Sequence, residues 1–224
     1  MLLAIDTSNQ TASIALHHQD GLRQECTWWS EQNHTTELMP AVVSLLAKQG
    51  VAVGQLQGVA VALGPGSFNG LRVGVSAAKG LAFALSIPLV GVGTLEILAY
   101  PHILARGLIR PVLPAGRDQV STALFRAFRG KWTRLEQDHL STLEEICDQT
   151  VRRTVFCGQL TLPMADFLHQ HLDRKALLAS PAASWRRAGF LAELAWQRLQ
   201  TGDSDSPITM EPIYLRRPSI GGAA

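Results

Sequence analysis

Residues 64–70, with the sequence GPGSFNG, form a glycine-rich loop before a segment with a helical pattern. Such a loop can hold phosphate, because backbone N–H groups and the dipole at a helix N-terminus both favour an anion. Three established loop patterns fail here: the Walker pattern lacks its Lys-Ser or Lys-Thr pair, the dinucleotide fingerprint misses Gly70 by one residue, and the nucleophile elbow fails at Gly66. The loop by itself therefore leaves a phosphate site and a structural turn equally open.

A second candidate site is the segment AIDTSNQTAS, in which Asp6 ends an expected strand and Thr7 and Ser8 follow in a turn. A carboxylate there could hold a metal-bound phosphate through water, and the hydroxyl and amide groups could contact phosphate oxygens. The same residue types are ordinary in turns, which we favour for the motif taken alone. The possible nucleotide or phosphate contacts of the chain are thus Asp6, Thr7, Ser8, Gly64, Pro65 and Gly66.

The elements that would position these segments follow from the hydrophobic pattern and the turn signals. Asp20-Gly21 predicts a hairpin between two strands. Pro40 predicts that the first helix begins late or bends, with Asn33 or Thr36 as its N-cap. For the first half we expect strands at 2–6, 11–18, 22–29, 58–63 and 88–92, and helices at 33–50, 71–85 and 94–104.

The second half repeats the strand pattern of the first. Placing Gly21 on Gly130 gives an offset of 109 residues and indicates an internal duplication. The pattern predicts an α/β protein with two similar subdomains, residues 1–105 and 106–215, and a disordered tail at 216–224. In the second half we expect strands at 109–114, 120–128, 131–136 and 154–158, and helices at 142–151, 162–172 and 184–199.

Small residues recur along one face of the predicted helix at 71–85. Gly70, Gly74, Ala78 and Leu81 follow one another at three- and four-residue spacing, so another element could approach this face closely. Gly74 inside a helix costs about 1 kcal/mol relative to alanine, which a packing contact should offset. The stripe therefore predicts close packing, either inside the domain or against a partner protein.

The composition is that of a globular protein, with 46% hydrophobic and 17% charged residues in a chain of 224. The net charge of +2 divides into −2 over residues 1–105 and +4 over 106–224, and the interleaved carboxylates favour a solvated surface over an RNA-binding one. Cys26, Cys147 and Cys157 form neither a disulfide framework nor a metal pair, which indicates a reducing compartment. Without a signal peptide or a membrane-spanning run, the expected location is the cytoplasm.

Three segments of the first half together resemble the TsaB family, also known as YeaZ. They are LLAIDTSNQTASIAL, ELMPAVVSLLAKQG and VAVALGPGSFNGLRVGVSAAKGLAFALSIPLVGVGTLEILA, of which GPGSFNGLR is the most specific part. EPIYLRRP resembles the end of the family's sequences, whereas residues 106–205 match loosely. The resemblance implies an actin-like, sugar-kinase-like (ASKHA) fold of two RNase-H-like subdomains. It also implies a role in forming N6-threonylcarbamoyladenosine next to the anticodon of tRNAs.

The resemblance also implies what the chain lacks. The related catalytic protein TsaD holds a metal through two histidines, and Thr94 and Leu98 stand at the matching positions, so neither ligand is present. The remaining histidines do not rebuild such a site, and we interpret His34 as a surface or capping residue. Pro114 stands where family members often carry an acidic residue, which weakens the case for ATP binding by this chain alone. We therefore expect no catalytic residue and no metal site.

Three functions from different classes follow from these observations. The first is a non-catalytic scaffold that binds TsaD as a heterodimer, with TsaE and TsaC in the same pathway, tRNA contacted indirectly, and a homodimer when the chain is isolated. The second is an ATP-dependent phosphotransferase of the sugar-kinase type, and the third is a metallopeptidase. We favour the scaffold, with no membrane contact, no cofactor bound catalytically, and ATP or ADP bound only weakly or at the TsaD interface.

The scaffold hypothesis places the partner interface on the two helices before and after the strand at 58–63. Gly74→Leu is expected to break the complex with TsaD while the fold is retained. The expected interface residues are Leu38, Val42, Leu46, Leu71, Gly74, Ala78 and Leu81.

Overall fold

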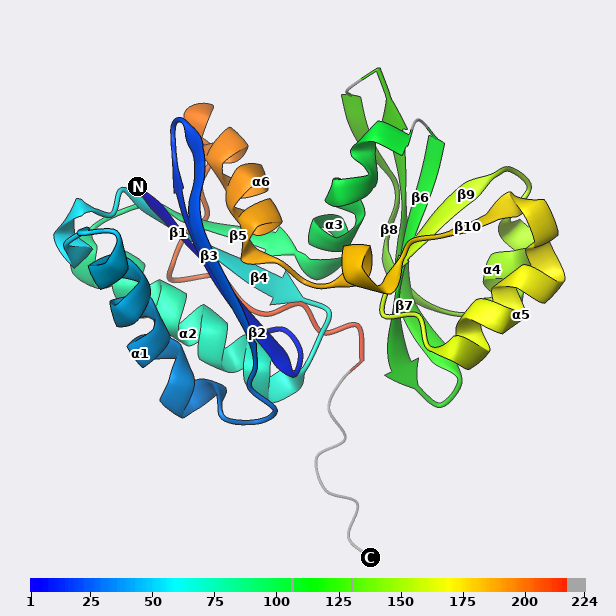
Figure 1. Cartoon of the computed structure of the whole chain (residues 1–224), viewed down its shortest axis with the longest axis horizontal. Coiled ribbons are helices and arrows are strands. Elements are labelled where there is room, and N and C mark those ends of the chain that lie inside the picture. The colour runs from blue at the N-terminus through cyan, green and yellow to red at the C-terminus, as the bar shows by residue number, and fades with distance from the viewer. Residues whose placement is uncertain (106, 130, 217–224) are drawn as a thin grey trace, which may run out of the picture. The chain divides into compact units, whose positions relative to one another are not determined.

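A five-stranded mixed sheet forms the centre of each of two units in the chain (Figure 1). The computed structural model describes residues 1–105, 107–129 and 131–216. The first unit contains Met1–Ile97 and Arg186–Tyr214, and the second contains Leu98–Trp185 and residues 215–216. The predicted tail at 216–224 lies, apart from Arg216, outside the described residues.

The first unit contains ten elements in chain order, with α3 leading into the second unit. They are β1 (Leu2–Asp6), β2 (Thr11–His18), β3 (Gly21–Trp29), α1 (His34–Lys48), the 3₁₀ turn η1 (Val53–Gln55), β4 (Gly58–Gly64), α2 (Phe68–Leu85), β5 (Leu89–Gly93), α3 (Thr94–Ala99) and, much later in the chain, α6 (Ala188–Gln200).

The second unit also contains ten elements in chain order. Its elements are η2 (Tyr100–Ala105), β6 (Gly107–Gly116), β7 (Gln119–Phe128), β8 (Lys131–Thr142), α4 (Leu143–Gln149), β9 (Thr154–Gly158), α5 (Leu162–Leu172), η3 (Asp173–Lys175), β10 (Ala176–Leu178) and η4 (Pro181–Ser184).

The two sheets have the same topology. The strand order is β3-β2-β1-β4-β5 in the first and β8-β7-β6-β9-β10 in the second. In each sheet the first three strands in sequence pair antiparallel, and the last two join in parallel. This repeated RNase-H-like topology confirms the predicted duplication and the actin-like α/β fold class.

Some sequence expectations differ from the structure. The first helix begins at His34 and runs through Pro40, which is exposed, so that water can satisfy the carbonyl left without an N–H partner. Asn33 is the N-cap residue, one of the two predicted, but its side chain makes no capping hydrogen bond. The three-residue strand β10 was not anticipated, because so short a run carries no usable alternation.

The predicted division at residue 105 also differs from the packing. Residues 186–214, which we expected in the second half, belong to the first unit. There α6 packs on β1 and β2, and the backbone N–H of Ala188 donates to Ser13 Oγ at 2.9 Å. The first unit is therefore closed by a helix from the far end of the chain.

Helices α1 and α2 cover one face of the first sheet and supply its main hydrophobic core. Leu38 and Val42 of α1 and Ala78 of α2 pack in this core with Ile5 and Val61 of the sheet. The expected interface residues are thus turned inward: Leu38, Val42, Leu46, Leu71, Gly74 and Ala78 are buried, and Leu81 is half-buried against the same core. The periodic stripes mark the faces that pack on the chain's own sheet, so these side chains contribute to the core of the first unit.

Gly74 is required by a contact inside the first unit. A Cβ atom at this position would lie 2.3 Å from Thr7 Oγ1, whereas a Cβ at Gly80, two turns along α2, would meet no atom within 4 Å. We therefore now expect Gly74→Leu to disturb the fold as well, because a larger side chain would collide with the turn after β1.

We expect Gly74→Ala to lower the free energy of unfolding by about 1–3 kcal/mol, the usual cost of overpacking. The matched control is Gly80→Ala, which should be neutral or gain up to about 1 kcal/mol because alanine favours the helix. Urea denaturation followed by circular dichroism measures both. Equal stability of the two variants would show that the contact with Thr7 does not constrain position 74.

None of the helices in the described residues is both long enough and apolar enough to cross a membrane.

Candidate functional site

The turn Asp6-Thr7-Ser8 at the end of β1 is packed against the beginning of α2. Thr7 Oγ1 donates to the carbonyl oxygen of Gly70 at 2.7 Å, and the backbone N–H of Ser67 donates to the carbonyl oxygen of Ser8 at 2.8 Å. A Cβ at Gly66 would lie 2.2 Å from that Ser8 oxygen, and a Cβ at Gly70 would lie 2.0 Å from the Thr7 oxygen. The two candidate sites predicted from the sequence therefore meet, and the glycines permit this close approach.

The side chain of Asp6 is fully buried and bonded within its own turn. Asp6 Oδ1 accepts hydrogen bonds from the Ser8 backbone N–H at 2.9 Å and from Ser8 Oγ at 2.5 Å. Ser8 Oγ in turn accepts from Arg186 Nη1 at 2.7 Å. Complete burial lowers the pKa of the Arg186 guanidinium, and the nearby Asp6 carboxylate opposes that shift. Asp6, Ser8 and Arg186 therefore form a buried chain in which a cation lies next to the carboxylate.

Arg186 is held in place by the docking of α6. The backbone N–H groups of Ala188 and Gly189, which begin α6, donate to Ser13 Oγ and to Glu25 Oε1, each at 2.9 Å. Glu25 also accepts two hydrogen bonds from Arg187, at 2.9 and 2.6 Å. Strands β2 and β3 thus supply the capping groups that α6 lacks in its own sequence. We did not predict Arg186 as a site residue, although two adjacent arginines before an apolar helix were the available signal.

This arrangement leaves little of the predicted phosphate site open. Asp6, Thr7 and Ser8 are buried, as are Gly64 and Pro65 at the end of β4, and only Gly66 of the predicted set is exposed. Gly64 lies against the C-terminal segment, where a Cβ would be 2.6 Å from the carbonyl oxygen of Ile213. The turn is therefore packed inside the first unit, and one oxygen of its carboxylate, Asp6 Oδ1, is already hydrogen-bonded.

The histidine that begins α1 is buried, contrary to our expectation of a surface or capping residue. His34 lies next to Gly70, and neither of its ring nitrogens has a hydrogen-bond partner among the described residues. The reason is the close packing of the start of α1 against the turn and α2, which was not visible from the helical pattern. Asp6 Oδ2 is a further buried atom without a described partner, so the region carries unsatisfied polar groups.

Thr94 and Leu98, at the positions expected from TsaD for metal-binding histidines, both lie in α3 and are buried. Thr94 Oγ1 has no hydrogen-bond partner within the described part of the chain. In that same part, no group of three or more His, Cys, Asp or Glu residues is placed to hold a metal ion.

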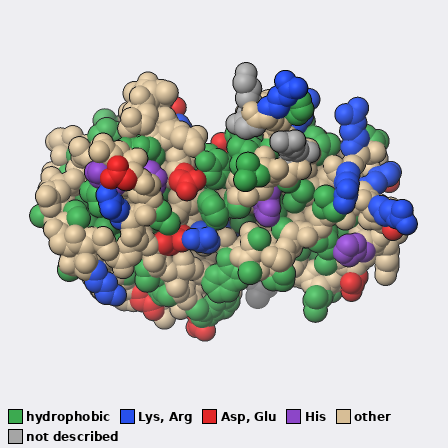
Figure 2. Space-filling model, turned by 45° about the horizontal axis from the view of Figure 1, so that its top comes forward, with side chains coloured by type: hydrophobic (Ala, Val, Ile, Leu, Met, Phe, Trp, Pro, Cys, Tyr) green, Lys and Arg blue, Asp and Glu red, His purple; other side chains and the backbone are tan. Residues whose placement is uncertain are grey.

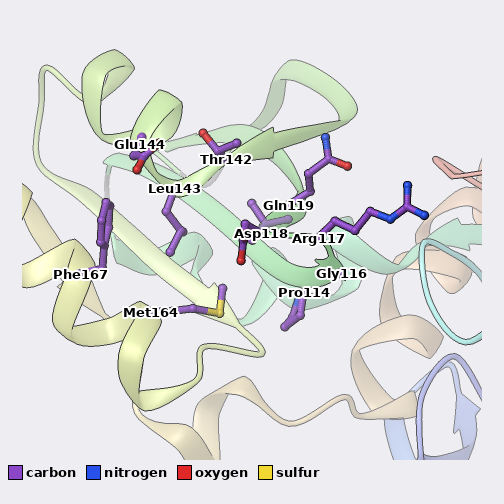
Figure 3. A pocket seen from close by; sticks show the side chains of 11 residues that line it. Pro114, Gly116, Arg117, Asp118, Gln119, Thr142, Leu143, Glu144, Met164 and Phe167 are labelled. Atoms are coloured by element: carbon purple, nitrogen blue, oxygen red, sulfur yellow. The ribbon is translucent and has the colours of Figure 1, made fainter.

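The second unit has a tight hairpin where the first has its buried turn. Only Arg117 and Asp118 connect β6 to β7, and both have positive φ angles, of 52° and 59°. Pro114, which replaces the acidic residue common in the resembled family, lies in β6 opposite Val120. The shorter connection leaves a cavity of about 520 Å³ beside α4 and α5 (Figure 3).

The lining of this cavity is mainly apolar and includes side-chain oxygen atoms that can accept hydrogen bonds. In Figure 3, Asp118 points into the cavity near Met164, whereas Arg117 extends away from it. A carboxylate directed into the cavity disfavours a phosphate that is not bound to a metal, because like charges repel. The cavity is lined by Pro114, Gly116, Arg117, Asp118, Gln119, Val120, Thr142, Leu143, Glu144, Met164 and Phe167.

Comparison with known proteins gives consistent matches. A family model described as TsaD, tRNA N6-adenosine threonylcarbamoyltransferase, matches residues 29–219. The tRNA threonylcarbamoyladenosine biosynthesis protein TsaB of Bacillus subtilis is 36% identical over 218 residues, which is 96% of this chain and 93% of the relative. TsaB of Haemophilus influenzae is 36% identical over 221 residues, with the same coverage of 96% and 93%.

Solved structures agree with these sequence matches. YeaZ from Pseudomonas aeruginosa has a TM-score of 0.81 and 25% identity, covering 96% of this chain and 99% of that one. A second structure with the same TM-score, identity and coverage is described as an uncharacterized protein with similarity to peptidase YeaZ from the same organism.

We expect Arg186→Met to lower the free energy of unfolding by about 3–5 kcal/mol, because it leaves the Asp6 carboxylate buried without its cation. The adjacent Arg187→Met is the control, since Arg187 is 47% exposed and its ion pair with Glu25 should contribute about 1 kcal/mol or less. Urea denaturation measures both, and the double change Arg186→Met with Asp6→Asn should recover part of the loss. Equal effects of the two arginine variants would contradict a buried charge pairing.

Proposed function

Because the chain belongs to the TsaB family, we propose that it is an accessory subunit in the formation of N6-threonylcarbamoyladenosine in tRNA. It binds and activates TsaD and does not catalyse the reaction itself. The observation that carries the non-catalytic part is the buried chain of Asp6, Ser8 and Arg186, because it uses the carboxylate and hydroxyl that a phosphate site would need.

The two alternative functions have less support from the residues present. A sugar-kinase-type phosphotransferase needs acidic turns open to a metal-bound nucleotide, and Asp6 is buried while Pro114 replaces the second acid. A metallopeptidase needs metal ligands, and Thr94 and Leu98 offer at most one weak hydroxyl donor. We assign no catalytic cofactor to the chain, and propose that ATP or ADP binds only weakly or at the interface with TsaD.

The surface that would bind TsaD is the outward side of α1 and α2. Val43 of α1 is 62% exposed and Phe83 of α2 is 80% exposed, although both are apolar. We define the outer face by eight exposed residues of these two helices. They are Met39, Pro40, Val43 and Ala47 of α1 and Ser76, Gly80, Phe83 and Ala84 of α2.

The composition of the outer face suits a protein partner. Its residues are uncharged, although the exposed Arg72 lies one turn before Ser76 and the exposed Lys48 follows Ala47. The small side chains at Ser76, Gly80 and Ala84 follow one another one turn apart, so that a partner helix could approach α2 closely. An exposed apolar face of this kind favours an interaction site over a simply hydrated surface. In the absence of TsaD the same face would support a homodimer.

Reconstitution tests the proposal as a whole. Cognate TsaD, TsaC and TsaE are incubated with tRNA, threonine, bicarbonate and ATP, with and without this chain, and the modified adenosine is quantified by mass spectrometry. We expect modification to depend on the chain. Modification at an unchanged rate without it would refute the role of an activating subunit.

The outer face generates a prediction with a matched control. Phe83→Asp should weaken the complex with TsaD at least tenfold, about 1.4 kcal/mol, because a charge would be buried at the contact. The control is Leu162→Asp, which places the same charge at an apolar residue of the second unit that is 82% exposed. Isothermal calorimetry gives both affinities, and circular dichroism verifies the fold. If both variants bind TsaD as the parent does, the interface lies elsewhere.

A further inference from the structure

Four cations of the second unit lie together with their charged groups unengaged. Arg152 and Arg153 precede β9, and Arg174 and Lys175 precede β10. All four are exposed, and none forms an ion pair or a side-chain hydrogen bond with another described residue. We call this set the basic cluster. Figure 2 shows Lys and Arg side chains gathered on part of the second unit.

The sheet topology brings the basic cluster together. Strands β9 and β10 pair in parallel, with Thr154 opposite Ala176. Arg153 and Lys175 immediately precede these two residues, so they begin adjacent strands whose backbones are about 4.8 Å apart. Residues 22 positions apart in the sequence thus form one cationic surface, and Asp173 is the only carboxylate within the two connecting segments 150–153 and 173–175.

Most cations elsewhere in the described chain have a structural partner. Arg23, Arg110, Arg134, Arg187 and Arg198 form ion pairs, Arg186 binds Ser8, and Lys79 donates to the carbonyl oxygen of Met210. These contacts account for the even charge distribution that we inferred from the sequence, in which the arginines were interleaved with carboxylates. The basic cluster differs because four unpaired charges lie in two connecting segments that lead into adjacent strands.

We propose that the basic cluster binds the phosphate backbone of RNA, so that the chain contacts the tRNA directly within the complex. The inference rests on the proposed function, which supplies tRNA as the polyanion. A cationic surface without an apolar centre is typical of phosphate contacts, whereas a protein interface is usually built around buried aromatic or aliphatic anchors. Val151, 74% exposed, is the only large hydrophobic residue in the two connecting segments of the cluster.

The test measures tRNA affinity separately from modification. A fluorescently labelled tRNA transcript is titrated with the full chain, alone and bound to TsaD, between about 50 and 200 mM salt. The test variant changes all four residues of the basic cluster to glutamine. The control variant removes the same charge elsewhere, by changing Arg23, Arg117, Arg126 and Arg129 to glutamine.

We expect the test variant to bind tRNA at least tenfold more weakly at the lowest salt concentration. The slope of log affinity against log salt should fall by about 3, because each lost phosphate contact removes about 0.7–0.9. The control should keep most of the parent's affinity and slope, and polyglutamate should not displace the tRNA at equal charge concentration.

Four results would overturn the proposal. They are no tRNA binding by the parent in either form, unchanged binding by the test variant, equal losses in the test and control variants, and efficient displacement by polyglutamate, which would indicate an acidic protein partner.

Failure of the proposed function can be distinguished from failure of the RNA-binding proposal. If modification does not need the chain but the test variant still loses tRNA affinity, the RNA surface stands and the activating role does not. If modification needs the chain and tRNA binding is unchanged, only the RNA surface is refuted.

Discussion

The close approach of the Asp6–Ser8 turn to α2 constrains the whole first unit. Backbone atoms of the turn occupy the space where Cβ atoms of Gly66 and Gly70 would stand, and Thr7 Oγ1 occupies that space at Gly74. The beginning of α2 is thereby fixed against β1, and its apolar side faces the sheet. Because one side of α2 is committed to this contact, the opposite side with Gly80 and Phe83 must face outward.

Burial of the turn also explains why the first unit is discontinuous in sequence. A carboxylate taken out of water needs hydrogen bonds and a nearby cation, and Asp6 receives two hydrogen bonds from Ser8 and the charge of Arg186. Arg186 is 178 residues away from Ser8 in the sequence, so α6 must return to the first sheet to deliver it. The docking of α6 and the burial of Asp6 are therefore mutually dependent.

Local patterns in the sequence predicted much of the fold, whereas contacts between residues far apart in the sequence could not be predicted from them. Alternation and the Asp20-Gly21 turn gave the strand pattern, and the repeat of that pattern gave the duplication. The small-residue stripe on α2 was identified as a close-packing face, but periodicity cannot tell whether such a face meets the chain's own turn or another protein. His34 and Arg186 were misjudged or missed because their burial depends on segments distant in sequence.

The two units share a sheet topology but differ at the turn after the first strand of each sheet. The Asp6–Ser8 turn of the first unit is buried, and Arg186 lies close to its carboxylate. The turn of the second unit consists of Arg117 and Asp118 beside a mainly apolar cavity, into which the Asp118 carboxylate points. Other side chains that recognition could use lie on the outside of each unit. A helical face with exposed apolar residues in the first unit and unpaired cations in the second are suited to different partners, a protein and a polyanion. A chain with this division of surfaces is better suited to bringing two macromolecules together than to transforming a small substrate.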